Sequence, residues 1–158
     1  MQIRQGTVQD WPFMYELAKE VIPINISPWR KQPSEVTMEY RLKILKNFWA
    51  WIRQSNSKVF IAEMEEKKPV GFCVLYPKAV EELTGLPQAW IMDVTVAADY
   101  RNQGVGRDLM EAAEGYCREQ DIPYIGLAVS THNLQALKLY QDLGYVEERK
   151  LMVKVLKK

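Results

Sequence analysis

The stretch that decides the fold is Val94-Thr95-Val96-Ala97-Ala98-Asp99-Tyr100-Arg101-Asn102-Gln103-Gly104-Val105-Gly106-Arg107. Its first three residues end an apolar, β-branched segment, and the two glycines precede a helical pattern of apolar residues. A helix that begins this way leaves its first backbone N–H groups unpaired, and glycines let an anion approach them closely. Arg101 and Arg107 add positive charge beside those groups. The stretch therefore predicts a turn that binds phosphate.

Other interpretations of the same turn were compared with it. A dinucleotide-binding fingerprint needs a third glycine three residues after Gly106, where this chain has Leu109. A P-loop needs Gly-Lys-Ser/Thr at the start of the helix, and the chain has Gly106-Arg107-Asp108. An ordinary turn with glycines for close packing stays open on these residues alone.

The elements around this turn alternate between strand and helix. We expect a strand over 89–96, a helix over 104–120, a second strand over 123–130 and a helix over 133–143. Gly144 ends the last helix, as glycine often does after a helix C-terminus. A strand, a crossover helix and a further strand form a right-handed unit, so the two central strands run parallel.

The remaining segments extend this pattern in both directions. The residues before position 89 predict a mixture of helices, strands and one proline-rich connection, and those after Gly144 a final strand or hairpin. The expected segments are a strand over 1–4, a helix from Asp10, irregular chain over 22–33, a helix over 34–53, a hairpin of 59–64 with 70–76, and a closing strand over 145–156. The class is α/β or α+β, with a mixed sheet and helices on both faces.

The composition argues against several classes of structure and function. The 158 residues predict a single domain over 1–158, and 21 basic against 20 acidic residues argue against a nucleic-acid partner. Cys73 and Cys117 lie far apart and His132 is the one histidine, which argues against a disulfide framework or a metal site. The apolar runs are too short for a membrane span. We expect a soluble protein of the cytoplasm.

Two motifs together resemble a known family. Arg101-x-x-Gly104-x-Gly106 is similar to the acyl-CoA-binding motif of the GNAT N-acetyltransferase superfamily. Asn133-x-x-Ala136-x-x-Leu139-Tyr140-x-x-x-Gly144-Tyr145 resembles the motif that follows it there. The resemblance covers essentially the whole chain and implies a mixed, mainly antiparallel sheet of six to seven strands. In that fold two parallel strands splay apart at the cofactor site.

The resemblance also implies which residues contact acetyl-CoA, with no metal required. The strand end offers backbone groups to the pantetheine arm, the turn holds the pyrophosphate, and the last helix begins beside the cofactor. For Asn133 a plain helix cap is an equal alternative. The residues implied are Val94, Thr95, Val96, Arg101, Asn102, Gln103, Gly104, Val105, Gly106, Arg107, Asn133 and Ala136.

Two residues, Tyr140 and Asp93, are candidates for catalysis. In the resembling enzymes the tyrosine at the position of Tyr140 protonates the departing thiolate or hydrogen-bonds its sulfur. Asp93 lies in an otherwise apolar strand, where an unpaired carboxylate is costly, so we expect either a structural donor or a cationic amine beside it. Diamine acetyltransferases carry a glutamate where this chain has Met92, and enzymes that acetylate protein N-termini carry one where it has Ala128.

The sequence gives weaker evidence that other polar and aromatic residues belong to the site. Glu81 and Glu82 precede the motif strand and line the acceptor site or, as we prefer, are solvated surface charge. Trp29 and Arg30 lie in the segment that usually shapes the acceptor pocket in the resembling family, but an ordinary surface loop explains them as well. Both cysteines fall in apolar periodic stretches, which gives an acyl-cysteine mechanism little support.

These residues predict an N-acetyltransferase that moves an acetyl group from acetyl-CoA directly to a primary amine in a ternary complex. The first alternative is an acyl-CoA-binding sensor of the same fold without turnover, and the second is an acyl-CoA hydrolase. The acceptor is a small-molecule or peptide amine, and a homodimer is the assembly that the resemblance implies. The sequence does not name the amine.

Overall fold

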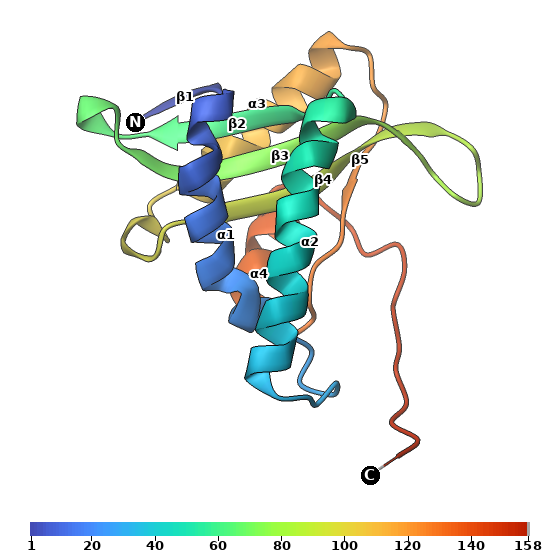
Figure 1. Ribbon diagram of the computed structural model, residues 1–158. Helices are drawn as coiled ribbons and strands as arrows, with labels where there is room; N and C mark the ends of the chain where they lie inside the picture. The colour runs from blue at the N-terminus through green and yellow to red at the C-terminus, as the bar shows by residue number, and fades with distance from the viewer. Residues whose placement is uncertain (158) are drawn as a thin grey trace.

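The computed structural model describes residues 1–157 and shows one layer of sheet between two layers of helices (Figure 1). Three short 3-10 turns connect these elements. The strands and helices are β1 (Gln2–Gln5), α1 (Trp11–Asn25), α2 (Ser34–Gln54), β2 (Lys58–Glu63), β3 (Pro69–Val80), β4 (Pro87–Val96), α3 (Val105–Glu119), β5 (Ile125–Leu127) and α4 (Leu134–Asp142). No helix of the described residues is long and apolar enough to cross a membrane.

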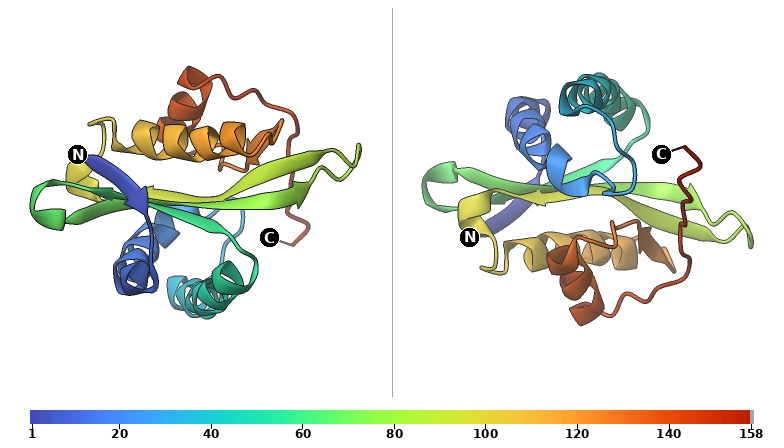
Figure 2. Two further views of the ribbon diagram at one scale, coloured as in Figure 1. Left: turned by 90° about the horizontal axis from the view of Figure 1, so that it is seen from above. Right: turned by 90° about the horizontal axis from the view of Figure 1, so that it is seen from below.

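The sheet has the order β1-β2-β3-β4-β5, antiparallel except for the parallel pair of β4 with β5. Helices α1 and α2 cover one face, while α3 and α4 cover the other (Figure 2). The inner strands β2 and β3 bury side chains on both faces because each face is covered by helices. The expected mixed, mainly antiparallel sheet between helices is confirmed.

Two apolar clusters fill the spaces between these layers. On the α3 and α4 side, Cys73 and Leu75 of β3 pack with Leu109 and Met110 of α3. On the α1 and α2 side, alternate residues of the same strand pack with Met14 and other apolar residues of α1 and α2. Successive side chains of a strand point to opposite faces, so β3 contributes to both clusters. This strand is the centre of the fold.

Two expectations about element length need correction. Helix α1 continues through Pro23 to Asn25, so only residues 26–33 are irregular rather than 22–33. A proline in the last turn removes one hydrogen bond at an end that frays anyway, and Ile22 is buried beneath that turn. Strand β5 has three residues instead of the eight expected over 123–130, because its pairing with β4 ends at Leu127.

The sheet has five strands in residues 1–157, fewer than the six to seven expected. The strand expected over 145–156 is absent, and this segment leaves the body of the molecule after α4 (Figure 1). Leu151 and Leu156 are 95% and 84% exposed. The four consecutive charged residues at 147–150 break the apolar alternation that a half-buried strand needs. Arg149 instead pairs with Glu81 and Glu82 of the β3–β4 hairpin.

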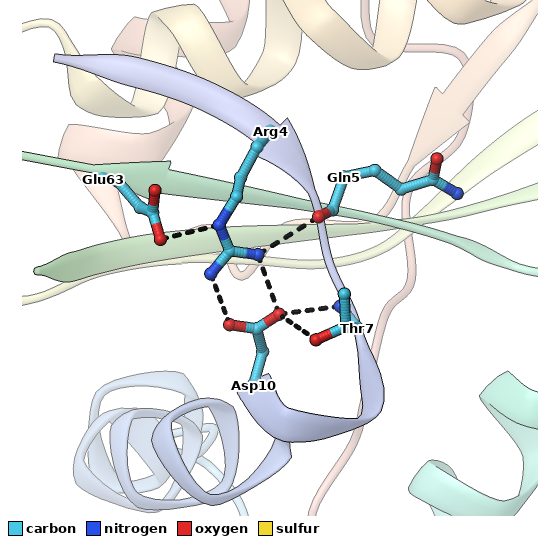
Figure 3. A network of polar contacts seen from close by, with 5 residues as sticks. All are labelled: Arg4, Gln5, Thr7, Asp10 and Glu63. Carbon is cyan, nitrogen blue, oxygen red and sulfur yellow. Dashed lines mark hydrogen bonds and ion pairs between the residues drawn. The ribbon is translucent and has the colours of Figure 1, made fainter. Parts of the chain in front are cut away.

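One ionic cluster ties the first strand to its neighbours. Arg4 of β1 donates from Nε to Glu63 Oε1 of β2 at 2.6 Å, and from Nη1 and Nη2 to both carboxylate oxygens of Asp10 at 2.9 and 2.6 Å (Figure 3). Asp10 Oδ2 also accepts from the Thr7 backbone N–H at 2.7 Å. Asp10 precedes the first residue of α1, but its side chain makes no capping hydrogen bond to that helix. It holds the turn before α1 against the sheet edge.

We predict that Asp10→Asn lowers the free energy of unfolding by about 1–3 kcal/mol at pH 7, because it removes a two-point contact from a side chain that is 8% exposed. Urea denaturation measures the change. The hydrogen bond from Arg4 lowers the pKa of Asp10 below its ordinary 3.8. The stabilisation is therefore present above pH 3.8 and is lost as the pH falls further. The difference in unfolding free energy between wild type and Asp10→Asn should therefore become smaller in acid.

Glu16→Gln is the matched control, since Glu16 pairs with Lys19 on the surface of α1 and its side chain is 61% exposed. It should change the stability little. Equal unfolding free energies for wild type and Asp10→Asn at pH 7 would show that the cluster contributes nothing.

Candidate functional site

The site begins where two parallel strands separate. Only Ala89, Trp90 and Ile91 of β4 pair with β5, opposite Ile125, Gly126 and Leu127. Strand β4 continues for five more residues to Val96 while the chain after Leu127 turns away. The sequence-based expectation of splayed parallel strands is confirmed, and a cavity opens between them.

A bulge in β4 lies at this separation. Val74 of β3 pairs with Asp93, but the next residue, Leu75, pairs with Ile91, so Met92 is the extra residue. Directly opposed residues of antiparallel strands share a face. Ile91 therefore lies with Leu75 on the α3 side of the sheet, and Asp93 lies with Val74 on the α1 and α2 side. Without the extra residue both would lie on the same face.

The cavity has a volume of about 440 Å³ and is bounded by five parts of the chain. Helices α1 and α2, strand β4, the segment after β5 and helix α4 all contribute to its walls. Its lining residues include Ile22, Arg41, Asp93, Val94, Asn133 and Tyr140. Three of the expected cofactor contacts, Val94, Asn133 and Ala136, thus lie at one cavity. Both expected catalytic residues, Asp93 and Tyr140, line it as well.

Asp93 is the acidic group of the cavity. Burial raises its pKa to about 6, although a hydrogen bond from Thr95, the charge of Arg41 and the Val94 backbone N–H each lower it. The Thr95 hydroxyl donates to Asp93 Oδ1 at 2.9 Å, and Thr95 itself is buried. Of the two partners that the sequence left open for this carboxylate, the structure shows the structural donor. The other carboxylate oxygen has no hydrogen bond from any side chain of residues 1–157.

Tyr140 lies in the α4 wall and is 9% exposed. Burial, with smaller contributions from Cys73 and Asp93, raises the pKa of its hydroxyl to about 12, so this group is protonated at neutral pH. Cys73 is fully buried in the adjacent strand, and burial raises the pKa of its thiol as well. The cavity therefore combines a carboxylate with a raised pKa and a phenol that keeps its proton at neutral pH.

The glycine turn begins at the far end of β4. Gly104 has φ +86°, a left-handed conformation that favours glycine, and a Cβ built there would meet no atom within 4 Å. A Cβ on Gly106 would lie 3.2 Å from Leu139 of α4 and 3.8 Å from Val96. Within residues 1–157, the N–H groups of Gly106 and Arg107 donate to no backbone carbonyl. These unpaired donors and the open approach at Gly104 fit a phosphate group.

Side chains of the turn brace it. Arg101 donates from Nε to the Val96 carbonyl at 2.9 Å, which ties the turn to the end of β4. Gln103 donates from its side chain to the Asp99 carbonyl at 2.8 Å, and Gln135 of α4 donates to Asn102 Oδ1 at 2.7 Å. The turn is thus held in place by β4 and α4 together.

The polar cap of α4 also lies at the cavity. Asn133 Oδ1 accepts a hydrogen bond from the Ala136 backbone N–H at 3.2 Å, so Asn133 caps the helix while it lines the cavity. In the preceding loop, His132 Nε2 lies 2.8 Å from the Ile24 carbonyl, and Ser130 donates to the Asn25 carbonyl at 3.3 Å. These contacts join the wall after β5 to the end of α1.

Several sequence candidates lie elsewhere. Glu81 and Glu82 are at the tip of the β3–β4 hairpin with Arg149, and Trp29 is 66% exposed in the α1–α2 loop; none of them lines the cavity. Conversely, the sequence analysis missed Arg41 of α2. Nothing in the sequence separates it from the other basic residues of that helix, because its position depends on how α2 crosses the sheet.

Parts of the chain are similar in sequence to known acetyltransferases. Streptothricin acetyltransferase of Streptomyces lavendulae is 30% identical over 92 residues, which are 58% of this chain and 46% of that protein. A ribosomal protein bS18 alanine N-acetyltransferase of Escherichia coli is 32% identical over 62 residues, 39% of this chain and 42% of that protein. The chain spans less than two thirds of the length of these curated relatives.

A solved structure of a Pyrococcus furiosus protein matches the fold with a TM-score of 0.81 at 24% identity, over 98% of this chain and 99% of that one. The sequence model described as the acetyltransferase (GNAT) family matches residues 11–145, which include the glycine turn and the whole cavity wall from α1 to α4. The chain belongs to the GNAT family of acetyltransferases.

Proposed function

We propose that this protein transfers an acetyl group from acetyl-CoA directly to a primary amine, within a complex that holds both substrates. The observation that carries the proposal is a cavity at the separated strands that is lined by both Asp93 and Tyr140, and the strand that carries Asp93 ends at the braced glycine turn. The family and the acetyltransferases among its relatives support acyl transfer in general. The amine and the direct mechanism are the further parts of the proposal.

Each residue has a separate task in this reaction. The unpaired N–H groups of Gly106 and Arg107 bind the pyrophosphate, and the backbone of Val94 to Val96 binds the pantetheine arm. Asp93, ionised at neutral pH, takes a proton from the incoming ammonium group. Tyr140 donates its hydroxyl hydrogen to the departing sulfur. Acetyl-CoA supplies the activated thioester.

Direct transfer is favoured over a covalent acyl-enzyme. Cys73 is the cysteine nearest to the site along β3, and it has no exposed surface and a raised pKa. A thiol that is buried and protonated is a poor nucleophile. The homodimer and the cytoplasmic location stay predictions.

The test is thiol release from acetyl-CoA by the purified protein across a panel of amines. The proposal requires a rate that depends on the amine and an N-acetylated product identified by mass. Thiol release that is independent of amine would instead identify a hydrolase. Binding of acetyl-CoA without thiol release from any amine would identify a sensor.

Gly104→Glu should abolish acetyl-CoA binding, because it puts a carboxylate at the open approach to the phosphate donors. The change also places a side chain at positive φ, which costs about 1 kcal/mol of stability. Gly85→Glu is the matched control, since Gly85 has φ +69° with nothing near its Cβ and lies in the β3–β4 hairpin. Calorimetry showing undiminished affinity in folded Gly104→Glu would contradict the assignment.

Tyr140→Phe should lower kcat by roughly 10- to 100-fold and leave KM for acetyl-CoA nearly unchanged, because the hydroxyl acts on a sulfur charge that develops in the transition state. The measurement is steady-state thiol release with the best amine. Tyr145→Phe is the control: its ring is 5.9 Å from that of Tyr140, yet it does not line the cavity. An equal loss in both variants would assign the effect to packing.

Asp93→Asn should lower kcat/KM by about 10²- to 10⁴-fold at pH 8, the usual contribution of a positioned base. The ratio of wild-type to variant kcat/KM cancels the titration of the amine itself. Because only ionised Asp93 accepts the proton, this ratio should be flat above about pH 7 and decline below pH 6. A ratio that is constant from pH 5 to pH 8 would remove Asp93 from the proton transfer.

The same substitution separates function from stability. The raised pKa of Asp93 means that ionising it disfavours the folded state at neutral pH. Asparagine has no such charge and still accepts the hydrogen bond from Thr95. Asp93→Asn should therefore be at least as stable as wild type at pH 7 in thermal unfolding, so its lower activity does not reflect unfolding.

A further inference from the structure

The cavity carries one full charge of each sign on separate walls. Asp93 lies in the β4 wall, and Arg41 lies in the α2 wall. They are the only aspartate, glutamate, lysine or arginine residues among those that line it within residues 1–157. A cavity with two opposite charges fits a molecule with two opposite charges.

Arg41 has no charge partner within the described part of the chain. No carboxylate of residues 1–157 forms an ion pair with it, and its guanidinium donates no hydrogen bond there. Its charge nevertheless reaches Asp93, whose pKa it lowers. Leu45, one helical turn later, lines the cavity too, so Arg41 lies on the face of α2 that meets the site.

The α1 wall is mostly apolar. Helix α1 contributes Ala18, Val21 and Ile22, with Asn25 at its end as the one polar residue, and Ile22 is 8% exposed. The apolar part of this wall accommodates an aliphatic side chain. This part of the cavity thus offers an acceptor molecule three different contacts: the Asp93 carboxylate, the Arg41 guanidinium and the apolar residues of α1.

We infer that the acceptor is a small amino acid, with its ammonium group at Asp93, its carboxylate at Arg41 and an aliphatic side chain against α1. This inference rests on the proposed acetyl transfer and narrows its substrate. The planar guanidinium matches a carboxylate with two parallel hydrogen bonds, which an amide or an alkyl group does not replace. Arg41 also repels the second ammonium group of a diamine, so the same residue excludes that class.

These groups account for every bond and proton that changes in the acetyl transfer. The amine nitrogen forms a bond to the acetyl carbon and the bond from that carbon to sulfur breaks. Of the two protons that the ammonium nitrogen loses, one passes to Asp93 and then to solvent, and the other reaches the sulfur through Tyr140. The product amide has lost the positive charge that Asp93 held, while its carboxylate remains, which favours release of the product.

A screen of the amino acids first identifies the best acceptor. Three amines with one side chain then test the inference: leucine, leucinamide and 3-methylbutylamine, which carry a carboxylate, an amide and neither group. Wild type should use the best amino acid with kcat/KM about 10- to 100-fold above its amide, the range expected for a charged hydrogen-bonded contact. At pH 8.5, well above the pKa of Asp93, Arg41→Gln should remove most of this preference, lowering kcat/KM for the amino acid far more than kcat/KM for the amide. Arg53→Gln, on the same helix but outside this cavity, should change neither value.

Arg41→Glu gives a second, independent result, because it should lower the rate with amino acids and raise the rate with 1,4-diaminobutane. The inference is overturned if the kcat/KM of wild type for amides, diamines or peptide amines equals that for amino acids. It is also overturned if Arg41→Gln lowers kcat/KM for all amines by the same factor. Failure of the proposed function is a different result: no amine, with or without a carboxylate, then accelerates thiol release.

Discussion

One extra residue in β4 determines the arrangement of this molecule's site. Met92 is unmatched against β3, and at the same point the pairing of β4 with β5 ends after Ile91 and Leu127. The bulge moves Asp93 to the face of α1 and α2 while Ile91 stays in the core beneath α3. Beyond Ile91, β4 stays paired with β3 on one side but has no strand on the other, so its free edge borders a cavity.

The rest of the site depends on that separation. It lets α4 bring Tyr140 from one side and α2 bring Arg41 from the other, with Asp93 between them on the strand. The carboxylate is held where burial raises its pKa to about 6, and the proposed role of Asp93 as a base near neutral pH requires this cost to stability. The hydrogen bond from Thr95 fixes its orientation. The glycine turn, braced by Arg101 and Gln135, lies at the end of the same strand.

The sequence predicted the parts of this site that depend on local pattern. The glycine turn, the cap at Asn133 and the helical position of Tyr140 follow from spacing and family motifs, and the structure brings Asp93, Val94, Asn133, Ala136 and Tyr140 to one cavity. The bulge and Arg41 were not predictable, since each depends on strand register or helix crossing. The strand expected over 145–156 was wrong because four charges interrupt its apolar alternation.

The most direct test of the cofactor site is to map backbone amide resonances of the labelled protein during titration with acetyl-CoA. The largest shifts should fall in the turn at Gly106 and Arg107, in β4 at Val94 and at the start of α4. Shifts concentrated instead at the second cavity, of about 270 Å³ between Gln5 and Ser57, would contradict it. That result would place the cofactor on the opposite end of the sheet from the separated strands.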